Sequence, residues 1–248
     1  MIITKSPAEL EFMREAGRVT AAALVAVAAA VRPGVTTGEL DELAERVIRE
    51  AGAVPAFKGY HGFPGTLCTS IDEQVVHGIP GERVLREGEI LSVDCGAIVE
   101  GYYGDSAMTF PVGKVSGQAR RLLAVTRASL EAGIARCVPG MRLHDISAAI
   151  QAVAESAGFS VVREYVGHGI GRSMHEDPQV PNYGQAGTGP TLKPGMVLAI
   201  EPMINAGAAD VRPLDDGWTV VTADGALSAH FEHTVAVTEA GPLILTLE

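Results

Sequence analysis

The sequence repeats its own order of structural signals about 106 residues further along the chain. Pro33-Gly34 and Pro139-Gly140 each follow a segment with apolar residues at helical spacing, and the two pairs lie 106 positions apart. Gly52 and Gly158, which are typical helix terminators, keep the same offset. Each half therefore predicts two successive helices, the first ending at Pro-Gly and the second at Gly.

A β-rich run that ends in a carboxylate also occurs twice, at an offset of 107. Residues 88–94 (GEILSVD) align with residues 195–201 (GMVLAIE). Short apolar patterns also recur by chance in unrelated proteins. A carboxylate at the same position of both runs favours two related halves that share one site. We expect one domain over residues 1–248, with pseudo-repeat halves at about 6–111 and 115–237.

Local signals give the expected helix ends. Ser6-Pro7 is typical of an N-cap followed by Pro at the first helical position, and this helix is expected to stop before Arg32. Thr37 is expected to cap the second helix. In the second half we expect one helix from about 118 to 137 and another that ends at Gly158.

Composition excludes several classes of function. A net charge of −11 argues against nucleic-acid binding, which requires clustered Lys and Arg. The 13-residue apolar run Val19–Val31 is too short to span a membrane and lacks a net positive leader, so a buried helix is expected instead of a targeting segment. Cys68, Cys95 and Cys137 have no CxxC spacing, which favours neither disulfides nor a zinc cluster. We expect a cytoplasmic monomer without membrane or nucleic-acid partners.

Two aspartates occupy a predicted β-hairpin. The runs 90–93 and 102–110 are β-rich, and Asp94 and Asp105 are symmetric about the midpoint of positions 99 and 100. This symmetry predicts that they lie directly opposite each other on one face, roughly 5 Å apart at Cβ. Opposed like charges are destabilising unless a cation or a shared proton compensates. A bulge that turns one Asp toward solvent is the alternative, and the hairpin alone does not decide between them.

Three further residues extend the candidate site. His168 lies between glycines that allow close backbone approach, and Glu201 directly follows an apolar run, where an unpartnered carboxylate would be costly. Glu232 lies in an alternating segment, whose partner strand is expected to start at Trp218 across the Asp224-Gly225 turn.

Four carboxylates and one imidazole form an oxygen-rich ligand set. Such a set suits Mn, Fe(II) or Co better than structural zinc. Two divalent ions would balance the four negative charges and leave a bridging hydroxide as nucleophile, with the ions about 3.5–4 Å apart.

Seven short motifs surround these residues in order along the chain. They are 76–80 (VHGIP), 92–96 (SVDCG), 103–105 (YGD), 167–171 (GHGIG), 175–176 (HE), 200–202 (IEP) and 231–234 (FEHT). Together they resemble type I methionine aminopeptidase, of peptidase family M24, over residues from about Ser6 to Val237. Each motif alone is weak, whereas the ordered combination is highly specific.

The resemblance implies a fold and an activity. The fold is α+β, the pita-bread (creatinase/aminopeptidase) architecture, with two pseudo-symmetric αβ halves around a curved antiparallel sheet. The activity is metal-dependent removal of the initiator methionine from nascent polypeptides whose second residue is small, by attack of the bridging hydroxide on the scissile carbonyl. The implied partners are the nascent N-terminus and, transiently, the ribosome.

The resemblance also implies metal ligands. By it, Asp94 chelates one divalent ion, His168 and Glu201 bind the other, and Asp105 and Glu232 bridge them. Glu201 would in addition relay the proton of the nucleophile, as a catalytic residue.

Two histidines and an apolar pocket complete the implied site. His175 would donate a hydrogen bond to the developing oxyanion, and His77 would contact the peptide beyond the scissile bond, both as catalytic and substrate-binding residues that do not ligate metal. Structural polar contacts are the alternative role for both. The pocket for the methionine side chain would be lined by Phe57, Tyr60, Phe63, Cys68, Met174 and Trp218. Each of these apolar residues could equally belong to the core.

The departures from the family pattern are few. Asp72 stands where the family often has Asn beside a monovalent-cation (Na or K) loop, which puts the affinity of that site in doubt. Met174 and His230 replace the common Phe and Gln. His61 mirrors His168 in the repeat but matches no ligand, so we expect it to bind no metal.

Two alternative functions are weighed against this one. Aminopeptidase P and prolidase have a similar ligand set but carry an additional N-terminal domain, whereas here the first matched helix begins at residue 7. A non-catalytic, ribosome-associated binding protein on the same fold would have lost ligands, whereas all five are present here.

Overall fold

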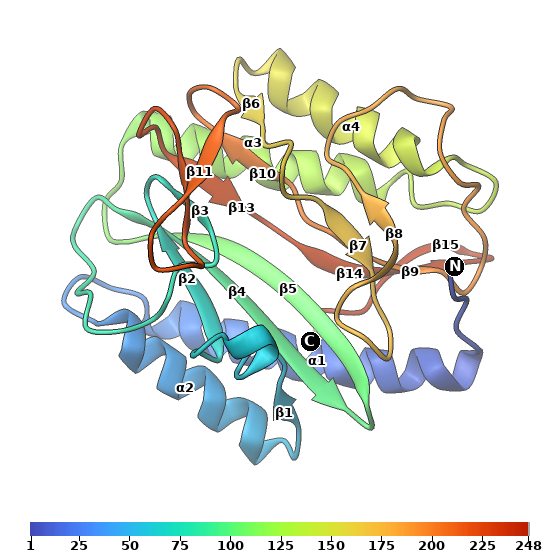
Figure 1. The fold of residues 1–248 in the computed structure, drawn as a ribbon, viewed down its shortest axis with the longest axis horizontal. Helices are drawn as coiled ribbons and strands as arrows, with labels where there is room; N and C mark the ends of the chain where they lie inside the picture. Colours follow the sequence, from blue (N-terminus) through green and yellow to red (C-terminus); the bar gives the residue numbers. More distant parts are fainter. Residues whose placement is uncertain (248) are drawn as a thin grey trace.

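Two pairs of helices flank the strands of the molecule. The computed structural model describes residues 1–247. One helix pair lies below the strands in Figure 1 and the other above them. The helices are α1 (Pro7–Ala30), α2 (Thr37–Glu50), α3 (Gly117–Ile134) and α4 (Leu143–Ser156), with a short 3₁₀ turn at Tyr60–Gly62. None of the helices within residues 1–247 has the length and apolar character to span a bilayer.

The strands pair antiparallel throughout. In the first half they are β1 (Val54–Pro55), β2 (Leu67–Ile71), β3 (Gln74–Val76), β4 (Ile90–Val99) and β5 (Tyr102–Pro111). In the second half they are β6 (Ser160–Val161), β7 (Gly167–Gly169), β8 (Glu176–Val180), β9 (Val197–Ile200), β10 (Met203–Asn205), β11 (Val211–Pro213), β12 (Val220–Thr222), β13 (Ser228–His230), β14 (His233–Thr238) and β15 (Gly241–Ile244). The longest strands are β4 and β5, with ten residues each, and β4 pairs with β1, β2 and β5. Segregated helices and antiparallel strands confirm the predicted α+β class.

The helix starts follow from capping boxes. Ser6 accepts a hydrogen bond from the backbone N–H of Glu9, whose carboxylate accepts from the backbone N–H of Ser6. This pair confirms the predicted start of α1. The prediction that Thr37 caps α2 was wrong by one residue. Thr36 forms the cap, because Glu39 stands three residues after it and completes the same reciprocal box.

The β4–β5 hairpin differs from its predicted register. The structure pairs Asp105 with Gly96, so the prediction that Asp105 lies directly opposite Asp94 was wrong. The cause is the turn, which consists of Glu100 and Gly101, both with positive φ (51° and 78°), one residue later than the predicted centre. Moving the centre by one residue shifts each pairing by two. The two aspartates therefore stay on one face as diagonal neighbours.

The second predicted hairpin was also wrong. The strand that follows Trp218, β12, pairs with β3 and β11, while the segment after the Asp224-Gly225 turn forms β13 and pairs with β10. One carboxylate oxygen of Asp224 accepts the backbone N–H of Ala226 within this loop, and the other accepts that of Ala208, in the loop between β10 and β11. These bonds hold the turn beside the end of β10, with which β13 pairs. The alternating segment is interrupted at Glu232, between β13 and β14.

Glycines allow α1 to lie directly on the central hairpin. A Cβ added at Gly104 of β5 would lie 2.6 Å from the backbone N of Gly17 in α1. The hydroxyl of Thr20 donates a hydrogen bond to the carbonyl oxygen of Gly104 across this contact (3.2 Å). Leu24, Leu40 and Leu91 belong to the core that α1, α2 and β4 bury together.

Gly104→Ala is expected to lower the free energy of unfolding by about 1–3 kcal/mol, because the added methyl would force helix and strand apart. Urea denaturation measures the change. Gly81→Ala is the matched control, since a Cβ at Gly81 meets no atom within 4 Å. A loss of stability no larger than that of the control would refute the close packing of α1 on β5.

Candidate metal centre and active-site cavity

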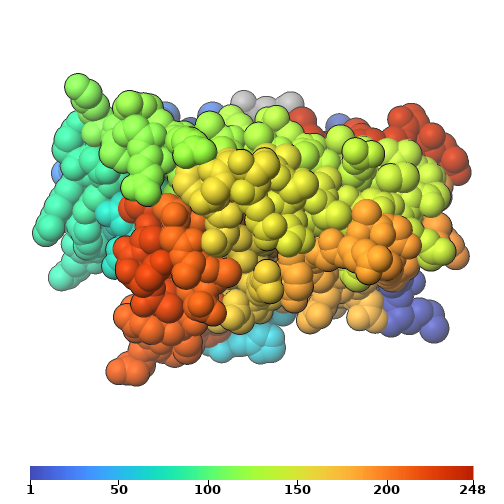
Figure 2. Space-filling view, turned by 90° about the horizontal axis from the view of Figure 1, so that it is seen from above, coloured from blue at the N-terminus to red at the C-terminus, as the bar shows by residue number. Residues whose placement is uncertain are grey.

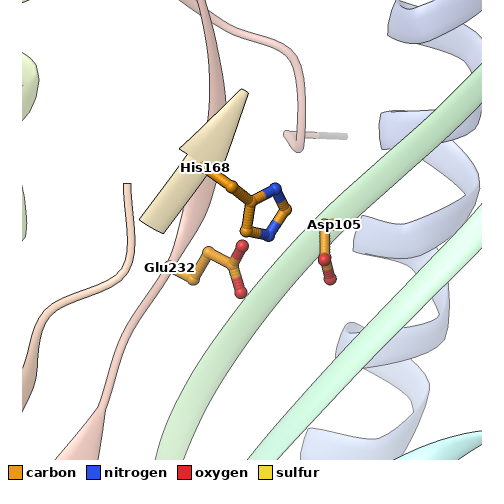
Figure 3. Close-up of side chains that lie close together, drawn as sticks. All are labelled: Asp105, His168 and Glu232. Atoms are coloured by element: carbon orange, nitrogen blue, oxygen red, sulfur yellow. The ribbon is translucent and has the colours of Figure 1, made fainter. Parts of the chain in front are cut away.

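The five predicted ligands come from both halves of the chain, on strands or directly beside them, and line one cavity. Asp94 lies on β4, Asp105 on β5, His168 on β7, Glu201 directly after β9, and Glu232 between β13 and β14. Ligand atoms of Asp105, His168 and Glu232 lie within 4.8 Å of one another, and Figure 3 shows these side chains facing a common space. The Nε2 atom of His168 is 3.5 Å from Oε1 of Glu201.

Several oxygens in this cluster lack hydrogen-bond partners. Among residues 1–247, Oδ1 of Asp94, Oδ1 of Asp105 and Oε1 of Glu232 are buried without a donor. A buried, unpartnered carboxylate oxygen is costly unless a cation or proton compensates it. The donor set of oxygens and one imidazole nitrogen therefore fits divalent metal ions.

Burial and mutual repulsion act on the same carboxyl groups. Burial raises the pKa of Asp94, Asp105, Glu201 and Glu232, because the charged form loses its hydration. Negative charge on neighbouring carboxylates raises the pKa of Asp105, Glu201 and Glu232 further. Bound cations would oppose both effects and favour the charged forms of these carboxyl groups.

Glycines on either side of His168 hold its strand close to its neighbours. A Cβ at Gly167 would lie 2.3 Å from the carbonyl oxygen of Ala199 in β9, and a Cβ at Gly169 would lie 2.1 Å from that of Asp177 in β8. Nδ1 of His168 lies 3.0 Å from the carbonyl oxygen of Gly169 and can donate a hydrogen bond to it. The other ring nitrogen, Nε2, is then unprotonated and faces the cluster. Burial lowers the pKa of His168 to about 4, so the ring is neutral at pH 7 and available as a ligand.

Hydrogen bonds join the two halves beside the carboxylates. The backbone N–H of Asp105 donates to the hydroxyl of Thr234 (3.0 Å), and that hydroxyl donates to the carbonyl oxygen of Asp105 (2.7 Å). The hydroxyl of Ser106 donates to the carbonyl oxygen of Glu232 (2.7 Å). These bonds fix the main chain on which two of the repelling side chains stand.

All the predicted site residues line one cavity of about 250 Å³. One wall is apolar and aromatic, and the carboxylate cluster forms the other. The residues beside the cluster are Phe57, Tyr60, His61, Phe63, Cys68, His77, Met174, His175 and Trp218. The ring of Phe63 meets that of Trp218 edge-on, with 5.0 Å between their centroids.

Two further histidines line the cavity beside aromatic side chains. The hydroxyl of Tyr60 is 2.9 Å from Nδ1 of His175, whose ring centroid is 4.3 Å from that of His168. His77 follows β3 with a positive φ of 61° and stands edge-on to Trp218 at 6.5 Å. Burial lowers the pKa of His77 to about 4. Neutral rings in these places can donate or accept hydrogen bonds to a bound peptide.

His230 is a residue of the cluster that sequence reasoning did not place there. Its buried Nε2 has no hydrogen-bond partner among residues 1–247 and lies 3.7 Å from Oε2 of Glu201 and 4.0 Å from Oε2 of Glu232. Its position two residues before Glu232 was the only signal, and the side-chain direction was not evident without the break between β13 and β14.

Comparison with known proteins agrees with this geometry. The sequence pattern of Metallopeptidase family M24 matches residues 11–239. Methionine aminopeptidase 1 of Bacillus subtilis is 57% identical over 246 residues, which cover 99% of each chain. The chain belongs to the type I methionine aminopeptidases of family M24. Methionine aminopeptidase 1 of Mycobacterium tuberculosis is 52% identical, over 98% of this chain and 94% of that protein.

Solved structures of the family show the same fold. The crystal structure of methionine aminopeptidase from Thermotoga maritima matches with a TM-score of 0.99 at 48% identity, covering 100% of both chains. Prolidase from Pyrococcus furiosus shares the fold alone, with a TM-score of 0.79 at 23% identity, and this chain spans 66% of it. The predicted pita-bread fold and the predicted class of enzyme, a metal-dependent aminopeptidase, are confirmed.

Divalent ions are expected to stabilise the chelator-treated protein, because they relieve repulsion among the buried carboxylates. An ion at 100 times its dissociation constant adds about 2.7 kcal/mol per site. Calorimetry with and without Mn²⁺ measures the rise in the unfolding midpoint. Asp105→Asn is expected to fold and to show a smaller rise, while the exposed Asp215→Asn serves as control. Equal rises in all three proteins would refute the metal centre.

Proposed function

We propose that this protein removes the initiator methionine from nascent polypeptides whose second residue is small. The observation that carries the proposal is an apolar-walled cavity that ends at buried carboxylates with unpartnered oxygens. One wall accommodates an unbranched thioether side chain, and the other holds the reacting carbonyl. The membership in the methionine aminopeptidases supports the same substrate.

Asp94 would hold one divalent ion, His168 and Glu201 the other, and Asp105 and Glu232 both. Bound ions of this kind neutralise the carboxylates and act as Lewis acids toward the scissile carbonyl. The ligand types suit Mn, Fe(II) or Co. We also propose a monovalent cation, Na or K, at the loop of Asp72.

The residues of the chain have separate tasks in the reaction. Glu201 accepts a proton from the attacking water and passes it to the leaving amine, because its side chain stands at the cluster and next to the cavity. His175 donates a hydrogen bond to the carbonyl oxygen as negative charge develops there. His77 contacts the peptide beyond the scissile bond. Phe57, Tyr60, Phe63, Cys68, Met174 and Trp218 enclose the methionine side chain and exclude water.

The wider setting follows from the same function. We propose a cytoplasmic monomer that meets nascent chains at the ribosome through transient contacts. The chain would act as one catalytic domain over 1–248, and its halves, at about 6–111 and 115–237, would each supply ligands to the shared site.

The chelator-treated protein supplied with Mn²⁺ or Co²⁺ is expected to release methionine from Met-Ala-Ser and to spare N-formyl-Met-Ala-Ser. The formyl group removes the cationic amine that an acidic site attracts. Chromatography of the released amino acid measures the reaction. Release from neither peptide would leave only a binding protein on this fold.

His175→Ala is expected to lower kcat by roughly 10² or more, because one preorganised donor to the oxyanion is lost. Steady-state kinetics on Met-Ala-Ser test this. His144→Ala is the matched control, since His144 lies on α4, bonds to Thr188 and does not line the cavity. A kcat equal to that of the control would assign His175 a structural task.

A further inference from the structure

A buried ion pair joins the N-terminal segment to the segment that carries His175. Nζ of Lys5 lies 2.6 Å from Oε2 of Glu176, and the two side chains are only 4% and 8% exposed. Lys5 precedes α1, whereas Glu176 begins β8, 171 residues later. Neither residue lines the cavity.

The second oxygen of Glu176 organises the turn between β7 and β8. Oε1 accepts backbone N–H groups from Arg172 (2.9 Å) and Ser173 (3.3 Å). The two residues that follow these donors, Met174 and His175, both line the cavity. One carboxylate therefore connects Lys5 to the main chain that directs both side chains.

The packing around the pair leaves little room for movement. A Cβ at Gly171 would lie 2.5 Å from Cε of Lys5 and 2.6 Å from Oε1 of Glu176. The carbonyl oxygen of Gly171 accepts the backbone N–H of Tyr103, on β5, at 2.9 Å. The turn is thus held between the ion pair on one side and the central hairpin on the other.

The backbone of Lys5 is hydrogen-bonded to the segment before β9, which in turn is hydrogen-bonded to β14. The N–H of Lys5 donates to the carbonyl oxygen of Gly195 (2.7 Å), and the N–H of Gly195 donates to the carbonyl oxygen of Val237 on β14 (2.9 Å). In Figure 2 the blue N-terminal residues lie at the edge of the molecule against the orange segment that leads toward β9. Through Lys5, the ion pair therefore connects the turn that carries His175 to the main chain next to Glu201 and Glu232.

We propose that Lys5 and Glu176 are positioning residues, which fix Met174 against the substrate side chain and His175 against the scissile carbonyl. This inference rests on the proposed function, because it assigns the pair to the pocket and the oxyanion donor of that site. Lys5 neutralises the buried carboxylate, and Glu176 supplies the acceptor for the turn. The two contributions can be separated by substitution. With Gln at position 176 and an uncharged residue at position 5, both charges are gone, but the Gln oxygen can still accept the N–H groups of Arg172 and Ser173.

Three variants separate charge from positioning. Lys5→Met leaves a buried carboxylate without a counter-ion, and kcat/KM on Met-Ala-Ser is expected to fall at least tenfold. Lys5→Met with Glu176→Gln removes both charges but keeps the acceptor, so kcat/KM is expected within about threefold of wild type. Lys5→Met with Glu176→Ala is equally uncharged but lacks the acceptor, so the tenfold loss is expected to return.

The decisive comparison is between the two double variants. In the Ala variant we expect lower kcat and a change of at least threefold in the preference for Met-Ala-Ser over norleucine-Ala-Ser, with manganese content equal to that of the Gln variant. A general loss of stability would not move this preference. Glu45→Gln is the control, because Glu45 likewise forms ion pairs, with Arg49 and Lys58, but lies on α2 and does not line the cavity.

Equal kcat and equal preference in the two double variants would overturn the inference, and this comparison holds even if Lys5→Met alone does not fold. A wild-type protein that releases no methionine would overturn the proposed function instead. An active wild type with indistinguishable double variants would overturn the positioning role alone.

Discussion

Repulsion among four buried carboxylates is the constraint around which this molecule is organised. Asp94 and Asp105 come from the first half of the chain, and Glu201 and Glu232 from the second, so no single half can assemble the cluster. Hydration is lost on burial, which raises each pKa and makes the charged forms costly. The main chain nevertheless holds these groups together, through hydrogen bonds that run between the halves at Thr234 and Ser106. A main chain that holds like charges together in this way is suited to bind a pair of cations between them.

The frame can resist this repulsion because its elements lie unusually close together. Gly17 and Gly104 let α1 rest on β5, and Gly167 and Gly169 let β7 lie between β8 and β9. Close contact of backbone atoms leaves few alternative arrangements for the side chains that the strands carry. The turn with His175 has no such strand pairing along its length. There the buried carboxylate of Glu176, paired with Lys5, accepts backbone N–H groups of the turn and restrains it.

Local chemistry made much of the fold predictable, and long-range pairing limited the rest. Capping residues predicted the ends of α1 and, within one residue, the start of α2. The hairpin of β4 and β5 was predicted, but its turn was misplaced by one residue, because the positive φ of Glu100 is not evident from a non-glycine residue. The predicted partner of β12 was wrong. Its observed partner, β3, lies far away in sequence, and hydrophobic periodicity does not specify which strands pair. The predicted site residues all line one cavity. The contact of His230 with Glu201 and the pairing of Lys5 with Glu176 were not predicted, because both join residues far apart in sequence.

The proposed function depends on paired divalent ions that neutralise the carboxylates from both halves. Anomalous diffraction from crystals grown with excess Mn²⁺ tests it most directly, because the signal locates the metal independently of the protein atoms. We expect two anomalous peaks, one beside Asp94 and one beside His168 and Glu201, with Asp105 and Glu232 in contact with both. Absence of both peaks, with the carboxylates turned toward solvent, would show that the cluster is not a metal centre.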